Sequence, residues 1–187
     1  MKILIIGANG TIGSMITKKL RLQHEVVTAG RSAGDLRVDL SSATSITRMF
    51  GKLKQIDACV CVAGESYSGS LSSINQGNLD LGISNKLLGQ INLVLIGQDY
   101  LTDAGSFTLI SGKMGDKPVK NSVGKAIVNG GINSFVLAAS LEMPRQLRIN
   151  VISPAKLSDI PEQELIAAYL KSIEGTINGE IIRVNYN

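Results

Sequence analysis

The chain has 187 residues, a length that suits a single folded domain with one substantial core. Hydrophobic residues make up 44% of it and charged residues 18%, a balance typical of globular proteins and not of disordered ones. The net charge is +4, but no run of basic residues is dense enough to predict nucleic-acid binding. No stretch has membrane-spanning length and no signal-peptide core precedes Gly7, so we expect a cytoplasmic protein with no membrane partner.

Short apolar runs alternate along the chain with stretches of helical spacing, which predicts a parallel sheet covered on both faces. The predicted strands are Lys2–Ile6, Glu25–Ala29, Arg37–Asp39, Ala58–Val62, Ser106–Ser111, Arg148–Ile152 and Glu180–Val184. The predicted helices are Ile12–Leu22, Ala43–Leu53, Ile74–Leu101 with a bend near Gly82, Val123–Leu141 and Pro161–Ile173. We therefore expect an α/β fold, a doubly wound parallel sheet of about seven strands (a Rossmann fold), in one domain over residues 1–187.

A glycine turn links the first predicted strand to the first predicted helix, with glycine at Gly7, Gly10 and Gly13. Glycine permits a sharp turn and lets backbone N–H groups come close to a pyrophosphate. The phosphate then lies at the helix N-terminus, where unpaired N–H groups favour negative charge. The spacing differs from the commonest dinucleotide fingerprint, and a turn without a ligand is the alternative. The strand before and the helix after favour nucleotide binding.

The chain offers little material for a metal site or a disulfide. Cys59 and Cys61 alternate along a predicted strand, so both point to one face of the sheet and are poorly placed to bond to each other. We expect two buried thiols. His24 is the single histidine, so no metal ion is expected.

Landmarks over the whole chain resemble the short-chain dehydrogenase/reductase family. They are the turn Gly7–Gly13, Ala29–Ser32, Asp39-Leu40, Val62–Gly64, Leu109–Ser111, Leu141-Glu142, Arg148–Pro154 and Asn178–Val184. The most specific is Arg148–Pro154, which resembles the family segment that passes the nicotinamide of the cofactor. The resemblance implies the Rossmann fold and a nicotinamide cofactor.

The resemblance also implies the residues that contact the cofactor. These are Gly7, Asn9, Gly10, Thr11, Ile12, Gly13, Arg31, Ser32, Asp39, Leu40, Ala63, Gly64, Ser153 and Pro154. Arg31 follows the second strand, where an acidic residue suits NAD and an arginine suits the 2′-phosphate of NADP. The planar Arg31 fork and the Ser32 hydroxyl favour NADP(H). The alternative is that Arg31 is a solvent-facing loop residue.

The catalytic tyrosine and lysine of the family do not match. Counted without gaps, the tyrosine position falls on Lys125 and the lysine position on Asn129. A register slipped by four residues puts Asn121 and Lys125 there instead, and again no tyrosine is present. The position of the family's relay asparagine falls on Lys86, so only the serine position, Ser111, keeps its residue type.

Four side chains are therefore candidate catalytic groups: Ser111, Lys125, Tyr67 and Lys86. Ser111 could hold a carbonyl oxygen, or be a plain serine at a strand end. A desolvated Lys125 could act as an acid or base, although a solvated lysine is commoner, and Tyr67 is either a loop candidate or a packing residue. Lys86, Lys113 and Lys125 together predict a cationic pocket for an anionic substrate.

Two functions compete at this point. One is an NADP(H)-dependent oxidoreductase acting on a small carbonyl or alcohol. The alternative, favoured by the loss of the tyrosine and the lysine, is an NADP(H)-binding sensor or regulatory protein, and a nucleotide-sugar enzyme on the same fold is a third possibility.

Two further expectations concern the open side of the site and the assembly. Only residues 155–160 lie where the family inserts a flap, which predicts an open site. The helices Ile74–Leu101 and Val123–Leu141 resemble those that pair in family dimers, so we expect a homodimer or homotetramer.

Overall fold

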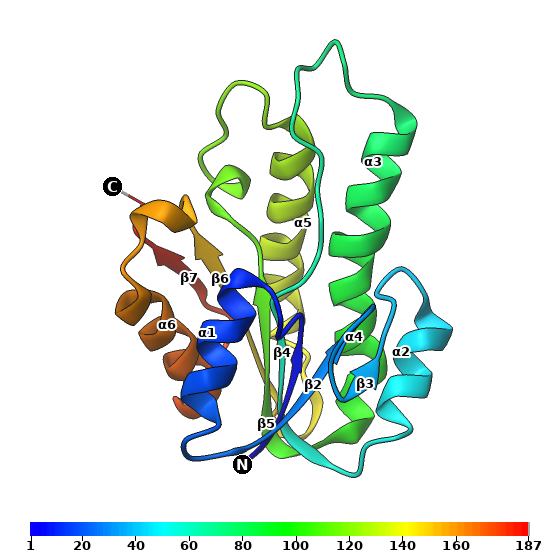
Figure 1. Cartoon of the computed structure of the whole chain (residues 1–187), viewed down its shortest axis with the longest axis vertical. Helices are drawn as coiled ribbons and strands as arrows, with labels where there is room; N and C mark the ends of the chain where they lie inside the picture. Colours follow the sequence, from blue (N-terminus) through cyan, green and yellow to red (C-terminus); the bar gives the residue numbers. More distant parts are fainter. Residues whose placement is uncertain (187) are drawn as a thin grey trace.

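The computed structural model describes residues 1–186, in which seven strands form one sheet in the order β3-β2-β1-β4-β5-β6-β7 (Figure 1). The strands are β1 (Lys2–Ile6), β2 (Glu25–Gly30), β3 (Leu36–Arg37), β4 (Ile56–Cys61), β5 (Leu101–Ile110), β6 (Arg148–Pro154) and β7 (Ile181–Val184). Every pair of neighbouring strands is parallel. The expected doubly wound parallel sheet is confirmed.

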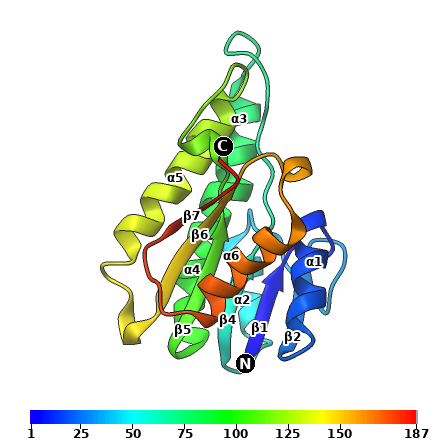
Figure 2. The same cartoon turned by 90° about the vertical axis from the view of Figure 1, so that its left-hand side faces the viewer.

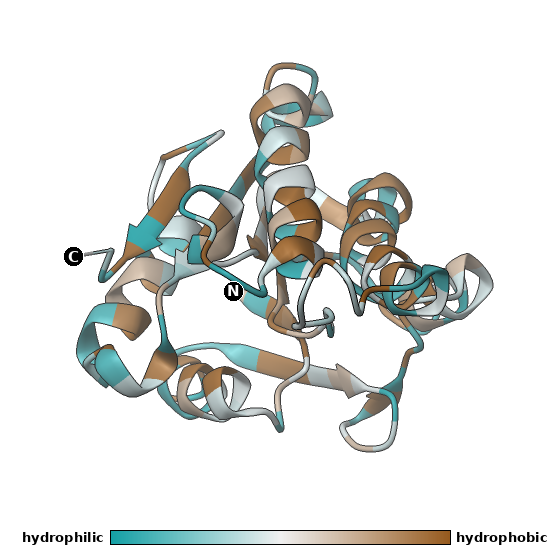
Figure 3. Cartoon of the chain, turned by 90° about the horizontal axis from the view of Figure 1, so that it is seen from above, coloured by the Kyte–Doolittle hydropathy of each residue, from teal (hydrophilic) through white to brown (hydrophobic). Residues whose placement is uncertain are grey.

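Residues 1–186 contain six α-helices, and helices cover both faces of the sheet, as Figures 2 and 3 show. They are α1 (Thr11–Leu20), α2 (Ala43–Phe50), α3 (Gln76–Gly82), α4 (Gly89–Gly97), α5 (Val123–Ala139) and α6 (Glu162–Glu174). Helices α2, α4 and α5 pack on one face and α1 and α6 on the other. No helix within residues 1–186 is long and apolar enough to cross a membrane.

The core consists of two apolar clusters, one on each face of the sheet. In β1, Leu4 and Ile6 belong to the cluster under α2, α4 and α5, while Ile3 and Ile5 belong to the cluster under α1 and α6. Because side chains alternate along a strand, burial of both faces requires an unbroken apolar run. This is why the central strands read as continuous apolar segments in the sequence.

The third strand is shifted from its predicted position. It was expected at Arg37–Asp39, but β3 is Leu36–Arg37. The chain leaves the sheet at Asp39, whose backbone N–H donates to Ser45 Oγ and whose carboxylate accepts from the backbone N–H and the hydroxyl of Ser41. These side-chain hydrogen bonds replace the ladder and start the turn into α2.

The long helix expected over Ile74–Leu101 is interrupted, as predicted, just after Gly82. A π-helical turn, Ile83–Leu88, separates α3 from α4. Such turns are rare and often occur at functional sites. The prediction was wrong at the C-terminal end, because Leu101 already belongs to β5 and pairs with Ile56.

Both cysteines are buried in β4, as expected, and both belong to the cluster under α4 and α5. Burial raises the pKa of the Cys61 thiol to about 12. Cys61 is therefore a protonated packing residue at neutral pH and not a nucleophile.

Candidate functional site

The candidate site lies where β1 and β4 are neighbours in the sheet. From β1 the chain continues to β2 on one side, and from β4 it continues to β5 on the other. A crevice opens outside the carboxyl ends of the strands at such a switch point, and ligands of doubly wound sheets bind there. The glycine turn after β1 and the loop after β4 both start at this edge, where Gly7 N donates to Ala29 O and Val62 N donates to Ile6 O.

The glycine turn is held by contacts that only glycine permits. Gly7 has a φ of +88°, and a Cβ on Gly13 would lie 2.1 Å from the Gly7 carbonyl oxygen. Gly10 is extended and precedes α1, whose first N–H groups receive no side-chain cap. Asn9, Gly10 and Thr11 are exposed here, while Ile12 is buried under the turn. This helix start is therefore open to a phosphate group.

A cavity of about 290 Å³ extends from the glycine turn toward β2 and β3. Its lining residues are Ile6, Gly7, Gly30, Arg31, Val38, Leu40, Ala63, Gly64, Glu65 and Asn85. Gly7, Arg31, Leu40, Ala63 and Gly64 are residues that the sequence predicted for the cofactor. Its walls are mainly apolar with an arginine at the side, a lining that fits an adenosine group carrying a phosphate.

The Arg31 guanidinium lies at the outer side of this cavity. Its Nη2 donates to Asn85 Oδ1 at 2.9 Å and lies 3.6 Å from Asp39 Oδ1, and its side chain is 69% exposed. Hydrogen bonds from the Ser41 side chain and backbone lower the pKa of Asp39. Ser32, next to Arg31, is exposed.

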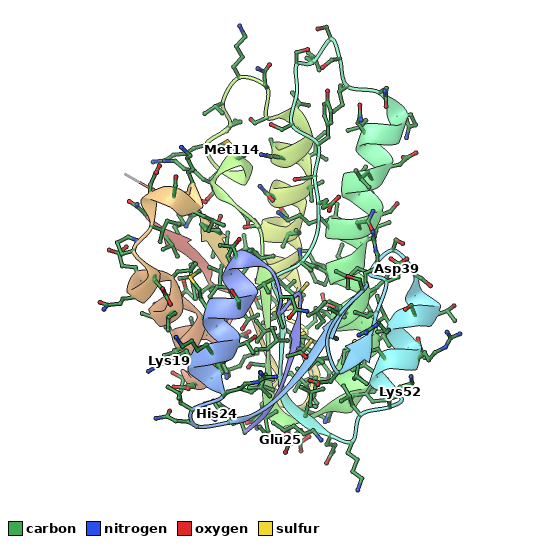
Figure 4. All side chains as sticks on the ribbon, in the orientation of Figure 1. Lys19, His24, Glu25, Asp39, Lys52 and Met114 are labelled. Atoms are coloured by element: carbon green, nitrogen blue, oxygen red, sulfur yellow. The ribbon has the colours of Figure 1, made fainter. Side chains whose placement is uncertain are left out.

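The other carboxylate near the end of β2 is turned into its own loop. Asp35 Oδ2 accepts hydrogen bonds from the backbone N–H and the hydroxyl of Thr28, at 2.9 and 2.8 Å, and these bonds lower its pKa. Asp35 is therefore engaged and does not offer its carboxylate to a ribose. In Figure 4, Asp39 lies on the side of α2, and Met114 lies on the opposite side of the view.

Lys86 lies at the inner end of the site, in the π-helical turn, and is only 8% exposed. Its Nζ donates to the backbone oxygen of Ser111 at 3.0 Å and to Asn129 Oδ1 at 2.8 Å. Burial, together with a smaller effect of the Lys125 charge and against an opposing effect of Cys61, lowers the pKa of Lys86 to about 8. Gly64 makes room for the lysine, because a Cβ there would lie 2.7 Å from Lys86 Cγ.

The contact between Lys86 and Asn129 joins two positions of the resembled family. In the ungapped register Lys86 falls on the asparagine position and Asn129 on the lysine position, whereas the register slipped by four residues puts Lys125 on the lysine position. The hydrogen bond between Lys86 and Asn129 does not depend on that choice. Sequence reasoning named Asn129 only as a mismatch. The complementary mismatch at Lys86 was the signal that could have identified the pair.

Ser111 follows β5 and is 4% exposed. Its backbone oxygen accepts from Lys86, but its Oγ has no hydrogen-bond partner among the described residues. A buried hydroxyl without a partner is costly in a folded protein, unless a ligand or water completes it. Ser111 thus has a free hydroxyl hydrogen-bonding capacity within the described residues, while its backbone oxygen binds the Lys86 ammonium.

Lys125, Tyr67 and Lys113, the other side chains that the sequence suggested for the site, differ in whether they lie near Lys86 and Ser111. Lys125 on α5 is half-buried and close enough to Lys86 to affect its pKa. The Tyr67 hydroxyl instead shares a hydrogen bond of 3.0 Å with Ser73 Oγ within its own loop. Lys113 Nζ donates to the backbone oxygen of Tyr186 at 3.2 Å. The structure thus groups Lys86, Ser111 and Lys125.

The end of β6 completes the inner part of the site. Ser153 is fully buried, and its Oγ shares a hydrogen bond with the Tyr186 hydroxyl, while Pro154 pairs with Val184 of β7.

The connection to α6 holds only a short 3₁₀ helix, Leu157–Asp159, as expected for an open site. Within the described residues, no three His, Cys, Asp or Glu side chains gather in a way that could hold a metal ion.

Several residues of the site were missed from the sequence, among them Val38, Glu65 and Asn85 in the cavity and Tyr186 beside Ser153. Tyr186 follows β7 by two residues. The carboxyl ends of parallel strands share one edge, so the position of Tyr186 was the available signal.

Known proteins share this fold over nearly the whole chain. The model of the NAD-dependent epimerase/dehydratase family matches residues 3–100. The protein lin1944 from Listeria innocua is 38% identical, with a TM-score of 0.94 and 98% of each chain covered. A small-chain dehydrogenase is 25% identical, with a TM-score of 0.89 and coverage of 98% of this chain and 95% of that chain.

A small-chain dehydrogenase in complex with NADPH is 23% identical, with a TM-score of 0.90 and coverage of 98% of this chain and 96% of that chain. None of the curated proteins matches the sequence. The family match and the structural neighbours confirm the resemblance to short-chain dehydrogenases.

The buried Lys86 gives a prediction for the stability of the protein. Its folded-state pKa, about 8, lies below the ordinary value of 10.5, so between these pH values the unfolded chain binds more protons than the folded one. The free energy of unfolding should therefore rise with pH in this window, by about 1.4 kcal/mol per pH unit at most.

Urea unfolding of the wild type, Lys86→Met and Lys19→Met between pH 7 and pH 10.5 measures this effect. Lys86→Met should lack the rise, whereas Lys19→Met, which changes an exposed lysine of α1, should keep it. Parallel curves for the wild type and Lys86→Met would contradict the lowered pKa.

Proposed function

Because the chain belongs to the NAD-dependent epimerase/dehydratase family and has the fold of short-chain dehydrogenases, we propose that it is an NADP(H)-dependent oxidoreductase acting on a small carbonyl or alcohol. The whole chain would act as a single cofactor-binding domain. A reduced nicotinamide cofactor, when bound, supplies a hydride. The chain itself must then bind the cofactor, orient the substrate and manage the charge and proton at the substrate oxygen.

The adenosine end of the site supports the choice of NADP(H). Arg31 borders the cavity with an exposed guanidinium, and Asp35, a carboxylate in the loop after β2, is engaged by Thr28. A guanidinium matches a phosphate in charge and geometry. One structural neighbour was solved with NADPH, which agrees with this choice.

The observation that carries the proposal is Ser111, whose hydroxyl has no hydrogen-bond partner among the described residues and whose backbone oxygen binds the buried Lys86 ammonium. As hydride reaches a carbonyl carbon, negative charge builds up on the oxygen. The Ser111 hydroxyl can donate a hydrogen bond to that oxygen, and the Lys86 charge stabilises it in a site with little water. Asn129 accepts from Lys86 and so holds the ammonium in place, while Lys125 adds positive charge that favours an anionic substrate.

A cofactor-binding sensor is the second candidate function. The observation that favours it is the absence of a tyrosine on α5, where Lys125 occupies the family's position. A sensor needs the cavity and the glycine turn but not the Ser111 and Lys86 groups. Tight NADPH binding without turnover would therefore identify a sensor.

We also propose that two copies of the chain pair through α4 and α5. Leu95 on α4 and Leu137 on α5 are 54% and 50% exposed, and a second cavity between these helices is lined by Phe135, Ala138 and Met143 among others. Exposed apolar groups on neighbouring helices are typical of an interface. A cytoplasmic location stays a prediction from the sequence.

Arg31→Ala tests the cofactor assignment. Loss of a charged hydrogen-bonding partner should weaken NADPH binding by about tenfold to a hundredfold, while NADH binding should change little. Fluorescence titration with both cofactors gives the dissociation constants. Arg37→Ala is the matched control, because Arg37 is also exposed but bonds to Gly34 O. Equal losses for NADPH and NADH would contradict the role of Arg31.

Turnover tests the role of Ser111 and Lys86. In NADPH oxidation assays with a panel of aldehydes, ketones and keto acids, Ser111→Ala and Lys86→Met should each lower kcat by about a hundredfold, because each removes stabilisation of the developing charge. The wild-type rate should fall as the pH rises through about 8, where Lys86 loses its charge. A rate that rises through this range would contradict an electrostatic role for Lys86.

Leu95→Lys tests the pairing of α4 and α5. A charge placed in an apolar interface should shift the protein to the monomer in sedimentation velocity experiments. Leu22→Lys serves as the control, because Leu22 is 73% exposed in the turn after α1. A wild type that sediments as a monomer would disprove the proposed pairing.

A further inference from the structure

The Tyr186 side chain lies at the inner part of the site, beside Ser153, and no sequence motif predicts it there. It lies two residues after β7, and Asn185 between them has a φ of +55° and donates to the backbone oxygen of Asp159. This bend carries the Tyr186 ring back over the end of β6, where its hydroxyl shares a hydrogen bond with Ser153 Oγ.

Ser153 is next to Ser111 in the sheet. Ile110 and Ile152 are register partners, and Ser111 N donates to Ile152 O at 2.9 Å, so the two serines follow side by side. Ile110 and Ile152 face α1 and α6, so alternation puts both serine side chains on the face toward α5. Neighbouring strands are about 4.8 Å apart, so the Ser153 hydroxyl that binds Tyr186 and the unpaired Ser111 hydroxyl lie at adjacent positions of the sheet.

Positive charge surrounds the Tyr186 ring. Lys113 Nζ, Lys117 Nζ and Arg183 Cζ lie 5.6, 5.8 and 5.9 Å from its centroid. Both lysines also donate to the Tyr186 backbone oxygen, at 3.2 and 3.5 Å. Asp116 is the acid in this group, and Arg183 Nε donates to its Oδ2 at 2.7 Å. The charge of Arg183 favours a phenolate at Tyr186, whereas Asp116 opposes it.

We propose that Tyr186 supplies the phenolic hydroxyl that the site lacks on α5, and that it donates its proton to the substrate oxygen during reduction. The inference rests on the proposed oxidoreductase function. The substrate carbonyl carbon gains the hydride, the electron pair of the C=O π bond moves to the oxygen, and the oxygen takes the Tyr186 proton. The phenolate that remains is stabilised by the neighbouring cations and regains a proton from water, which reaches the half-buried ring.

The state of Tyr186 in the free protein agrees with this role. Burial raises the pKa of its phenol, and Asp116 adds to the rise, while the hydrogen bond with Ser153 and the charge of Arg183 oppose it. The phenol therefore stays protonated at neutral pH, which is the form that an acid needs.

Tyr186→Phe removes this hydroxyl and keeps the ring. Loss of a positioned general acid should lower kcat by about a hundredfold or more, while the NADPH dissociation constant should stay within about threefold of the wild-type value. Tyr100→Phe is the matched control, because Tyr100 stacks on Phe50 at a centroid distance of 5.2 Å and this ring contact remains. A Tyr186→Phe enzyme with wild-type kcat would overturn the proposal.

A titration tests the placement of Tyr186 without any turnover. With tyrosine labelled with ¹³C at Cζ, the resonance missing from Tyr186→Phe belongs to this residue. Bound NADP⁺ carries a positive nicotinamide ring, which should lower the pKa of a neighbouring phenol by about one pH unit or more. The Tyr100 resonance should not move.

The two experiments separate the failure of this proposal from the failure of the proposed function. A wild type that binds NADPH without turnover overturns the oxidoreductase function. In that case the change in the Tyr186 pKa on NADP⁺ binding still tests whether Tyr186 lies beside the nicotinamide. A Tyr186 pKa that does not change when NADP⁺ binds overturns the inference, whatever the turnover.

Discussion

The Lys86 ammonium is held between the Ser111 carbonyl and the Asn129 amide oxygen, and much of the site depends on this pair of hydrogen bonds. A buried charge without partners is unstable, so the protein must supply acceptors and space for the side chain. The acceptors come from the end of β5 and from α5. The space comes from Gly64, where a side chain would collide with the lysine stem. The π-helical turn presents Lys86 to these partners.

The two ends of the site differ in how they are built. The outer end, which we propose for the adenosine group, is made of backbone turns and apolar walls, with Arg31 exposed at its side. The inner end is made of buried polar side chains from several elements that are far apart in the sequence. A phosphate or an adenine needs mainly shape and a few backbone donors, whereas control of a developing charge needs groups fixed at defined positions.

In the ungapped register, Lys86 and Asn129 fall on the asparagine and lysine positions of the resembled family. The buried charge then lies in the π-helical turn between α3 and α4 and not on α5. A tyrosine on α5 paired with a lysine one turn away is therefore not available. Together with the unpaired Ser111 hydroxyl and the Ser153–Tyr186 contact, this describes a site that uses a different set of groups on the same fold.

The sequence by itself determined the sheet, its helices and the glycine turn, because apolar period and glycine spacing are local properties of the chain. It also identified Lys86 and Ser111 as candidates, and it placed Arg31 at the end of β2. It did not find the pairing of Lys86 with Asn129 or the position of Tyr186. Their contacts join residues 43 and 33 positions apart, for the Lys86–Asn129 and Ser153–Tyr186 pairs. Only the packing of α5 and β7 on the sheet brings such residues together. Local sequence patterns cannot predict contacts between residues so far apart in the chain.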